Sequence, residues 1–366
     1  MKFTITKKNF LTPLQKLNSI LFANHKNPIT NNIFFYIHNK YTYLISTNLE
    51  LEIIAKIHCS KIFNLGEILV SGKKILSIVR SFPSESEIHI TAKNNIMTLQ
   101  YKNIIFKLNT LHAKTFPRFK TEKITRNIYL NQYVFKNLIY NSHYAMAKQD
   151  VRHYLNGLNI EINSNKIFSV ATDGYRMAIT YTSYPNNTQS ISIIIPYKTI
   201  IELIKLLESK NNEMQVYIGN KIIQFNLKQY TLSSKLIENQ FPKYVNLIQK
   251  EFDKHIILDR EKLKQALLRA LIVINQKLHG VRIIIQKGLC IIQASNEHDE
   301  TIQEEFQINY SDEPIELTMN INYFLDVINI INQPNINIFL QNTSSIIYIK
   351  YKSDYNSYHI IMPLIL

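Results

Sequence analysis

Three short segments of the chain carry residue types that could perform chemistry. Residues 66–73, Gly-Glu-Ile-Leu-Val-Ser-Gly-Lys, resemble a phosphate-binding loop. However, five residues separate the two glycines where such a loop has four, and Lys74 stands where Ser or Thr should follow. The glycines also flank an apolar run that is typical of a strand. A nucleotide site is therefore not expected here.

Residues 297–300, Glu-His-Asp-Glu, place carboxylates beside an imidazole and could hold a hard cation. Consecutive side chains of a strand or a helix do not converge on one ion. No second ligand cluster is evident in the sequence. We therefore expect a charged loop that faces solvent or a partner.

Residues 173–176 place the acid Asp173 close to the base Arg176, as a hydrolase site can. Two similar segments carry Asn48 and Asn296 in place of the acid, so we expect a structural turn after a strand. The sequence also lacks a nucleophile motif, metal-ligand spacing and a dinucleotide fingerprint. We therefore assign no catalytic residue, no metal and no cofactor, and a non-enzymatic function is favoured.

The elements that must position these segments recur along the chain. Helical patterns start at Lys74, Lys198 and Asn322, at intervals of 124 residues, and a short strand-like run follows each of them. The three turn segments named above keep nearly the same period. This period is too long for a solenoid, whose repeats span roughly 20–50 residues. The copies therefore predict three domains of similar fold.

Each domain is predicted to be α+β, with two helices on antiparallel sheet. Amphipathic patterns predict the first helix of each domain over residues 11–21, 133–146 and 260–274. In the first domain, strands are expected over residues 32–38, 41–46, 51–58, 96–101 and 104–108. Charged stretches near 123–126 and 251–255 predict the domains 1–125, 126–253 and 254–366.

The charge of the chain favours an anionic partner. Lys and Arg number 42 against 27 Asp and Glu, which gives a formal net charge of +15. A genome rich in A and T can also raise the lysine content without any function. Basic side chains fall on predicted helices of every domain: Lys73, Lys74 and Arg80; Lys198 and Lys205; Lys262, Lys264 and Arg269. Such helices can bind a phosphate backbone without reading sequence, although solvated helix faces show the same pattern.

Cysteine content and hydropathy limit the cellular compartment. Cys59 and Cys290 alone cannot make a disulfide framework or a zinc site. The N-terminus has no signal-peptide pattern, and the longest apolar runs fall short of the ~18 residues that span a bilayer. A cytoplasmic protein without a membrane partner is expected.

Several long motifs together resemble one family. They are residues 149–157 (Gln-Asp-Val-Arg-His-Tyr-Leu-Asn-Gly), 171–178 (Ala-Thr-Asp-Gly-Tyr-Arg-Met-Ala), 241–244 (Phe-Pro-Lys-Tyr), 280–282 (Gly-Val-Arg) and 362–366 (Met-Pro-Leu-Ile-Leu). In these motifs the chain resembles the bacterial sliding clamps, the beta subunits of the replicative DNA polymerase III. The resemblance runs from the first residue to the last and includes all three repeats.

The resemblance implies a head-to-tail homodimer that closes into a ring of six similar domains, with strands outside and helices around the hole. The ring would encircle duplex DNA without sequence preference and tether the catalytic subunit of the replicative polymerase. A clamp loader that uses ATP would open it. Other polymerases and repair proteins would dock through short linear motifs.

The resemblance also implies site residues. DNA contacts are expected at Lys73, Arg80, Lys148, Gln149, His153, Tyr154, Lys198, His25 and Lys26. A partner-peptide cleft is expected at Leu155, Thr172, Gly174, Tyr175, Arg176, Met177, Pro242, Leu247, Tyr323, Ile346, Ile360, Met362, Pro363 and Leu364. The dimer interface is expected to use Phe106, Leu108, Ile272 and Val273, with Lys74 and other bases facing Glu300 and Glu304.

The sequence departs from the family pattern at Asn24, Asn246 and Ile365, which replace positions that are often basic in relatives. One direct DNA contact and the charge of the cleft rim are therefore in doubt. Two alternatives remain open: a nucleic-acid-processing enzyme with an unrecognised active site, and a monomeric basic scaffold that never closes into a ring.

Overall fold

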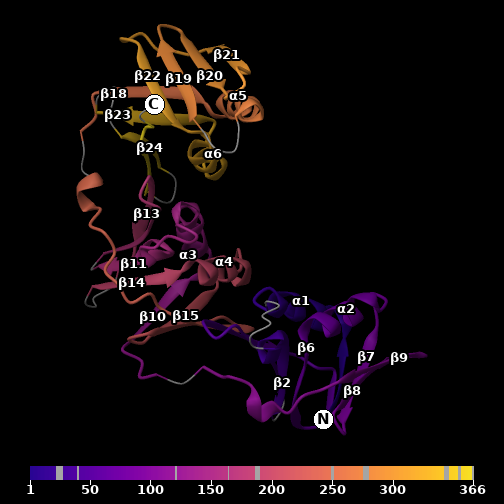
Figure 1. Ribbon diagram of the computed structural model, residues 1–366. Coiled ribbons are helices and arrows are strands. Elements are labelled where there is room, and N and C mark those ends of the chain that lie inside the picture. Colours follow the sequence, from indigo (N-terminus) through magenta and orange to yellow (C-terminus); the bar gives the residue numbers. More distant parts are fainter. Residues whose placement is uncertain are drawn as a thin grey trace. The chain divides into compact units, whose positions relative to one another are not determined.

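Antiparallel sheets make up most of the fold in the computed structural model (Figure 1). The chain forms two compact units. The structure describes residues 1–21, 28–38, 41–119, 122–163, 165–185, 190–248, 251–274, 280–341, 346–352 and 356–364. Unit 1 consists of Met1–Lys136 and Lys198–Leu236, and unit 2 of Asn137–Tyr197 and Ile237–Leu366.

Unit 1 contains two sheets. The five-stranded sheet has the order β5 (Lys61–Asn64), β1 (Lys2–Thr6), β7 (Glu87–Lys93), β8 (Ile96–Tyr101) and β9 (Ile104–Asn109). The eight-stranded sheet has the order β10 (Arg126–Asn131), β15 (Glu213–Ile218), β16 (Ile222–Asn226), β17 (Tyr230–Lys235), β4 (Leu51–Ile57), β3 (Tyr41–Thr47), β2 (Asn32–His38) and β6 (Gly66–Ser71). Helices α1 (Lys7–Asn18) and α2 (Gly72–Ser81) pack against each other, and α4 (Tyr197–Leu206) belongs to this unit from its second residue onward.

Unit 2 also contains two sheets. The eight-stranded sheet has the order β14 (Ile191–Pro196), β11 (Gly157–Asn163), β12 (Lys166–Thr172), β13 (Arg176–Ser183), β25 (Asn356–Ile361), β24 (Ile347–Lys352), β23 (Asn335–Leu340) and β18 (Lys254–Asp259). The four-stranded sheet has the order β21 (Thr301–Gln307), β20 (Leu289–Ser295), β19 (Gly280–Gln286) and β22 (Ile315–Asn320). Helices α5 (Arg260–Val273) and α6 (Ile321–Ile330) share one apolar core with these sheets, which confirms the α+β class.

Each eight-stranded sheet joins strands from two sequence repeats. In unit 1, β4 of the first repeat pairs with β17 of the second, and in unit 2, β13 of the second repeat pairs with β25 of the third. β4, β13 and β21 each follow the repeated turn, while β9, β17 and β25 are each the last strand of a repeat. β9 and β21 therefore correspond to strands that are paired elsewhere, yet both lie at a sheet edge without a partner strand among the described residues.

The apolar patterns of the sequence predicted most helices and strands closely. Helices α2, α4 and α6 each begin within two residues of the predicted start, and strands β2 and β8 have the predicted bounds. Helix α1 begins earlier than predicted, at Lys7, because the hydroxyl of Thr6 caps it by accepting the Asn9 N–H at 3.4 Å. In the described ranges, no helix is long and apolar enough to cross a membrane.

The prediction of one helix over residues 133–146 was wrong. Helix α3 (Gln132–Tyr140) stops at Tyr140, and a separate 3-10 turn, His143–Ala145, follows it. The cause is Ser142, whose buried hydroxyl lies 3.3 Å from the Leu138 carbonyl and 2.5 Å from the Ser169 hydroxyl. A serine that bonds to the carbonyl one turn back competes with helix propagation, and the apolar pattern alone cannot reveal this.

Two glycines at related strand starts offer a test of the packing of unit 2. A Cβ atom on Gly157, the first residue of β11, would lie 2.6 Å from the Ile195 carbonyl oxygen. On Gly280, the first residue of β19, its nearest neighbour would be Leu364 Cδ1 at 3.6 Å, an ordinary contact.

We therefore expect Gly157→Ala to lower the unfolding free energy by about 1–3 kcal/mol, since backbone atoms would have to move. Gly280→Ala should leave it unchanged or raise it slightly, because alanine restricts the unfolded chain. Calorimetric melting of both variants measures the difference, and an equal loss in the two would contradict the packing described.

Candidate functional site

A hollow of about 230 Å³ lies on one face of the eight-stranded sheet of unit 2. Helices α5 and α6 pack on the opposite face of its β23–β24 part. The side chains of Phe241, Tyr244, Leu247, Ile248 and Phe252 cover this face, which we call the outer face. The hollow is lined by Arg152, Tyr154, Leu155, Thr172, Gly174, Tyr175, Arg176, Met177, Pro242, Leu247, Ile346, Ile360 and Met362. Eleven of the fourteen residues predicted for the partner cleft thus meet at one place.

The hollow has an apolar floor and an exposed apolar rim. Leu155 and Ile360 are only 2% and 4% exposed, whereas Tyr175 and Met362 are 62% and 46% exposed. The Met362 N–H donates to the Tyr175 carbonyl at 2.9 Å, so the rim is tied across the sheet. Such a surface suits an aromatic or aliphatic anchor of a binding partner.

A tight turn between β12 and β13 holds one wall of the hollow. The Thr172 hydroxyl donates to the Arg176 carbonyl at 2.6 Å, and an Asp173 carboxylate oxygen accepts the Arg176 N–H at 3.0 Å. Gly174 has a φ of +96°, and a Cβ atom there would lie 2.9 Å from Nη2 of Arg152, so only glycine fits. Asp173 therefore has the structural role predicted for it.

A related turn occurs in the other repeats, and in the third repeat it is one residue longer. An Asn48 side-chain oxygen accepts the Leu51 N–H at 2.9 Å, and an Asn296 side-chain oxygen accepts the Glu300 N–H at 3.1 Å. In the third repeat this turn carries the segment 297–300, whose side chains are exposed as expected for a charged loop. Among the described residues, no group of three or more His, Cys, Asp or Glu is placed to hold a metal ion.

Arg176 connects the hollow to its supporting elements. Its guanidinium donates to Asp173 at 2.9 Å, to Asp326 of α6 at 2.6 Å and to the Tyr144 carbonyl at 2.9 Å. It also stacks on Tyr323, with 4.4 Å to the ring centroid. Burial opposes its charge, but the ion pairs with both carboxylates outweigh burial and raise the pKa of Arg176.

Three predicted cleft residues lie outside the lining. Tyr323 sits behind the hollow, against Arg176, while Pro363 and Leu364 continue past the rim, where the Leu364 N–H donates to the Thr318 carbonyl at 2.8 Å. Arg152 lines the hollow but was not predicted there, although it stands inside the recognised segment 149–157.

The predicted DNA contacts lie in both units. In unit 1, Lys73 and Arg80 are exposed on α2 and Lys198 is exposed on α4. In unit 2, Lys148, Gln149 and His153 are exposed, whereas Tyr154 is half-buried and lines the hollow. His25 and Lys26, like Asn24 and Ile365, lie outside the described residues. Asn246 is exposed.

Part of the predicted interface lies on β9 and β21, the edge strands that lack a partner strand among the described residues, and part lies on helices α2 and α5. In unit 1, Phe106 and Leu108 are half-buried on the edge strand β9, and Lys74 is exposed on α2. In unit 2, Ile272 near the end of α5 is 82% exposed, and Val273 follows it. Glu304 on the edge strand β21 already accepts two hydrogen bonds from Arg269, at 2.7 and 2.5 Å, and Glu300 accepts one from Asn296.

Comparison with known proteins shows which family the chain belongs to. Family models for the N-terminal, central and C-terminal domains of the DNA polymerase III beta subunit match residues 1–120, 129–243 and 245–365. The chain belongs to the DNA polymerase III beta subunit family. The three matches agree with the three repeats.

Relatives of this beta-subunit homologue match over full length. It is 36% identical to the beta sliding clamp of Buchnera aphidicola subsp. Rhopalosiphum padi and 31% identical to that of Escherichia coli (strain K12), with 100% of each chain covered. The crystal structure of the DNA polymerase III subunit beta from Pseudomonas aeruginosa has a TM-score of 0.93 and 31% identity, again over 100% of both chains.

A buried histidine beside the hollow gives this beta-subunit homologue a testable pH dependence. His359 on β25 is 0% exposed, and its Nδ1 lies 2.7 Å from the Tyr144 hydroxyl. Burial lowers the pKa of His359 to about 3. The unfolded chain takes up this proton near pH 6.5, so the stability that the neutral ring contributes is present above that pH and is lost as the pH falls toward 3.

We expect the unfolding free energy of the unsubstituted chain to fall by about 1 kcal/mol more than that of His359→Phe between pH 7.5 and 5.5. Denaturant titrations followed by circular dichroism at both pH values measure the two slopes. His298→Phe, at an exposed turn of the same unit, should keep the unsubstituted slope; parallel curves for all three chains would contradict the assignment.

Proposed function

We propose that the protein is a DNA sliding clamp that encircles duplex DNA and confers processivity on the replicative polymerase. The observation that carries this is the repeated junction. Three similar repeats are joined by the same edge-to-edge strand pairing, β4 with β17 and β13 with β25. Within the described part of the chain, β9 and β21 have no such partner, so each could make the same pairing again. Unpaired strand edges readily recruit another chain.

A second copy of the chain supplies the missing partner strand in this proposal. β9 of one copy would pair with β21 of the next, and the reverse junction would close the ring of a head-to-tail homodimer, since a heterologous contact that closes makes a ring. Phe106 and Leu108 on β9 would meet Ile272 and Val273 of the partner. Lys74 would approach Glu300 and Glu304. The three domains are assigned to residues 1–125, 126–253 and 254–366.

The role is structural and not catalytic. Exposed Lys73, Arg80 and Lys198, with Lys148, Gln149 and His153, would hold the phosphate backbone through weak, screened contacts that permit movement along the duplex. No base readout is needed, because topology and not affinity would retain the ring. We place the protein in the cytoplasm with the bacterial chromosome.

The hollow of unit 2 would dock a short peptide from the polymerase catalytic subunit, the clamp loader, or other polymerases and repair proteins. Its buried floor and exposed Tyr175 and Met362 support this use, because apolar side chains that stay exposed beside a pocket mark a binding surface. The adaptable thioether of Met362 would allow peptides of different shape.

Retention on DNA of two topologies tests the ring. A clamp loader and ATP place the protein on nicked circular plasmid, which is then passed through a sizing column in high salt. We expect retention on the circle and loss after the plasmid is linearised, because only a topological link resists high salt. Equal loss from both forms would mean simple electrostatic binding.

Two apolar side chains of the third repeat provide the matched variants. Ile272→Asp should abolish retention on the circle, since Ile272 is placed at the proposed junction, whereas Ile257→Asp, at a position 47% exposed on β18, should retain the ring. Analytical ultracentrifugation reports whether each variant remains a dimer. A dimeric Ile272→Asp would contradict the assigned interface.

Neighbouring residues at the rim of the hollow test the docking site. Met362 lines it and Leu364 does not, yet they are similarly exposed, at 46% and 39%. With a fluorescein-labelled pentapeptide ending in Leu-Phe, we expect Met362→Ala to weaken binding about tenfold, as loss of an anchoring contact does. Leu364→Ala should change the Kd much less in fluorescence anisotropy. The opposite ranking would move the site beyond the rim.

A further inference from the structure

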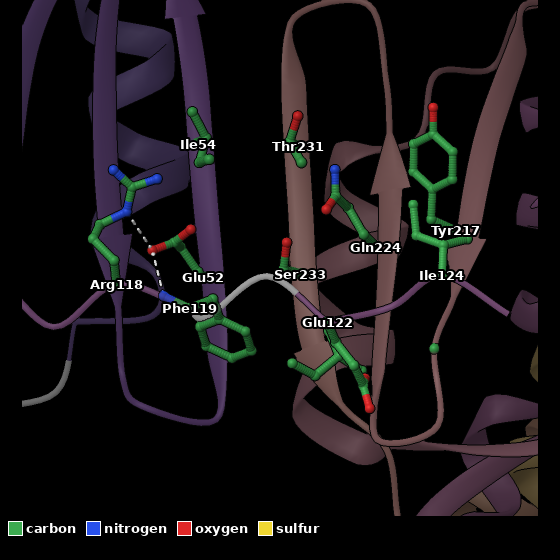
Figure 2. Close-up of a pocket in the computed structure, with 12 residues that line it drawn as sticks. Glu52, Ile54, Arg118, Phe119, Glu122, Ile124, Tyr217, Gln224, Thr231 and Ser233 are labelled. Carbon is green, nitrogen blue, oxygen red and sulfur yellow. Dashed lines mark hydrogen bonds and ion pairs between the residues drawn. The ribbon is translucent and has the colours of Figure 1, made fainter.

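A second hollow, of about 220 Å³, lies on the eight-stranded sheet of unit 1 (Figure 2). Its walls come from β4, from β15 to β17 and from residues 118–119 and 122–124. Figure 2 shows the side chains of Ser233, Thr231 and Gln224 between Glu52 on one side and Tyr217 on the other.

Strand register shows that this hollow is the counterpart of the cleft in unit 2. There, Met177 of β13 pairs with Ile360 of β25, and Ile360 pairs with Tyr348 of β24. In unit 1, Glu52 of β4 pairs with Ser233 of β17, and Ser233 pairs with Gln224 of β16, so the same three strand positions carry different residues.

The crossing segments correspond as well. Residues 242–244, Pro-Lys-Tyr, pass over the β13–β25 junction of unit 2. Residues 117–119, Pro-Arg-Phe, pass over the β4–β17 junction of unit 1. Leu247, which lines the cleft, stands five residues after its proline, and Glu122 stands five residues after the other. The two hollows therefore have the same construction and nearly the same volume.

Three positions of the lining differ in chemistry between the two hollows, although Ile54, Ile124 and Ile222 also line this one. Glu52 is 3% exposed, and its Oε2 accepts a hydrogen bond from Arg118 Nε at 3.0 Å and from the Phe119 N–H at 3.4 Å. Glu122 accepts the Lys221 N–H at 3.2 Å. Carboxylates and a hydroxyl thus occupy the positions of methionine, leucine and isoleucine.

An apolar side chain placed on this lining would cover groups that water still reaches, the exposed guanidinium of Arg118 and the half-buried Glu122 and Gln224, without offering them a hydrogen bond. That penalty cancels the gain from burying the apolar side chain. The same side chain over Met177, Leu247 and Ile360 meets no such penalty.

We propose that Glu52, Glu122 and Ser233 close this hollow to the apolar segments that the cleft accepts, so that each chain docks one partner segment instead of two. The inference rests on the proposed function, because it needs the cleft of unit 2 to bind peptide. In this inference, these three residues determine whether a chain has one docking site or two.

A residue exchange tests the proposal. The variant Glu52→Met, Glu122→Leu, Ser233→Ile takes the cleft residues, and isothermal titration with the pentapeptide ending in Leu-Phe counts sites. We expect one peptide per unsubstituted chain and two per exchanged chain. A single site in the folded exchange variant overturns the inference. No binding to the unsubstituted chain would instead refute the proposed function.

The reciprocal exchange provides the matched control. Met177→Glu with Ile360→Ser should remove the native site, and adding the three unit 1 substitutions to that background should restore one peptide per chain, now located in unit 1. If the full exchange does not fold, the smaller variant Glu122→Leu with Ser233→Ile keeps the Glu52–Arg118 ion pair. We expect a benzophenone-labelled peptide to crosslink to residues 117–124 of this variant and not to those of the unsubstituted chain. Absence of that crosslink also overturns the inference.

Discussion

Peptide groups along the edge of a β-sheet need hydrogen-bond partners, and this need organises the whole chain. Each repeat supplies two half-sheets, and each half-sheet ends in an open strand edge. Pairing β4 with β17 and β13 with β25 satisfies those edges and converts half-sheets into sheets of eight strands. The outer face of each junction then carries a crossing segment and a hollow. The continuous sheets, the two hollows and the open edges of β9 and β21 among the described residues all follow from one kind of strand pairing.

Local pattern in the sequence predicted the elements of each repeat well. Strands β2 and β8 have the predicted bounds. β8 alternates between buried and more exposed residues, whereas β2 is a nearly continuous apolar run that is buried on both faces, and both patterns are local signals. Helix α3 was predicted too long, since its apolar spacing continues beyond Tyr140 while a buried serine hydroxyl ends the helix. Which strands of different repeats pair with each other could not be predicted, because residues more than 170 apart, such as Leu51 and Ser234, carry no local signal of their contact.

The candidate site was predicted from motifs rather than from physics alone. The resemblance as a whole named eleven of the thirteen residues that line the hollow. It did not name Asp326 or Tyr144, which hold Arg176 in place from distant parts of the chain. Such partners have no spacing rule, because the ion pair exists only after α6 has packed beside the sheet. The structural role of the repeated turn was predicted correctly, because Asn48, Asp173 and Asn296 recur at nearly the same period in the sequence.

The crossing segments also set an order of strength among the junctions of the proposed ring. Within a chain, residues 110–125 and 236–253 connect the paired repeats covalently, so a strand that detaches stays at an effective concentration on the order of millimolar beside its partner. A β9–β21 junction joins two separate chains and has no such tether. Its closure depends on protein concentration, whereas the other junctions do not. Dilution, or a protein that opens the ring, would therefore separate the β9–β21 junction first, because no covalent connection holds it.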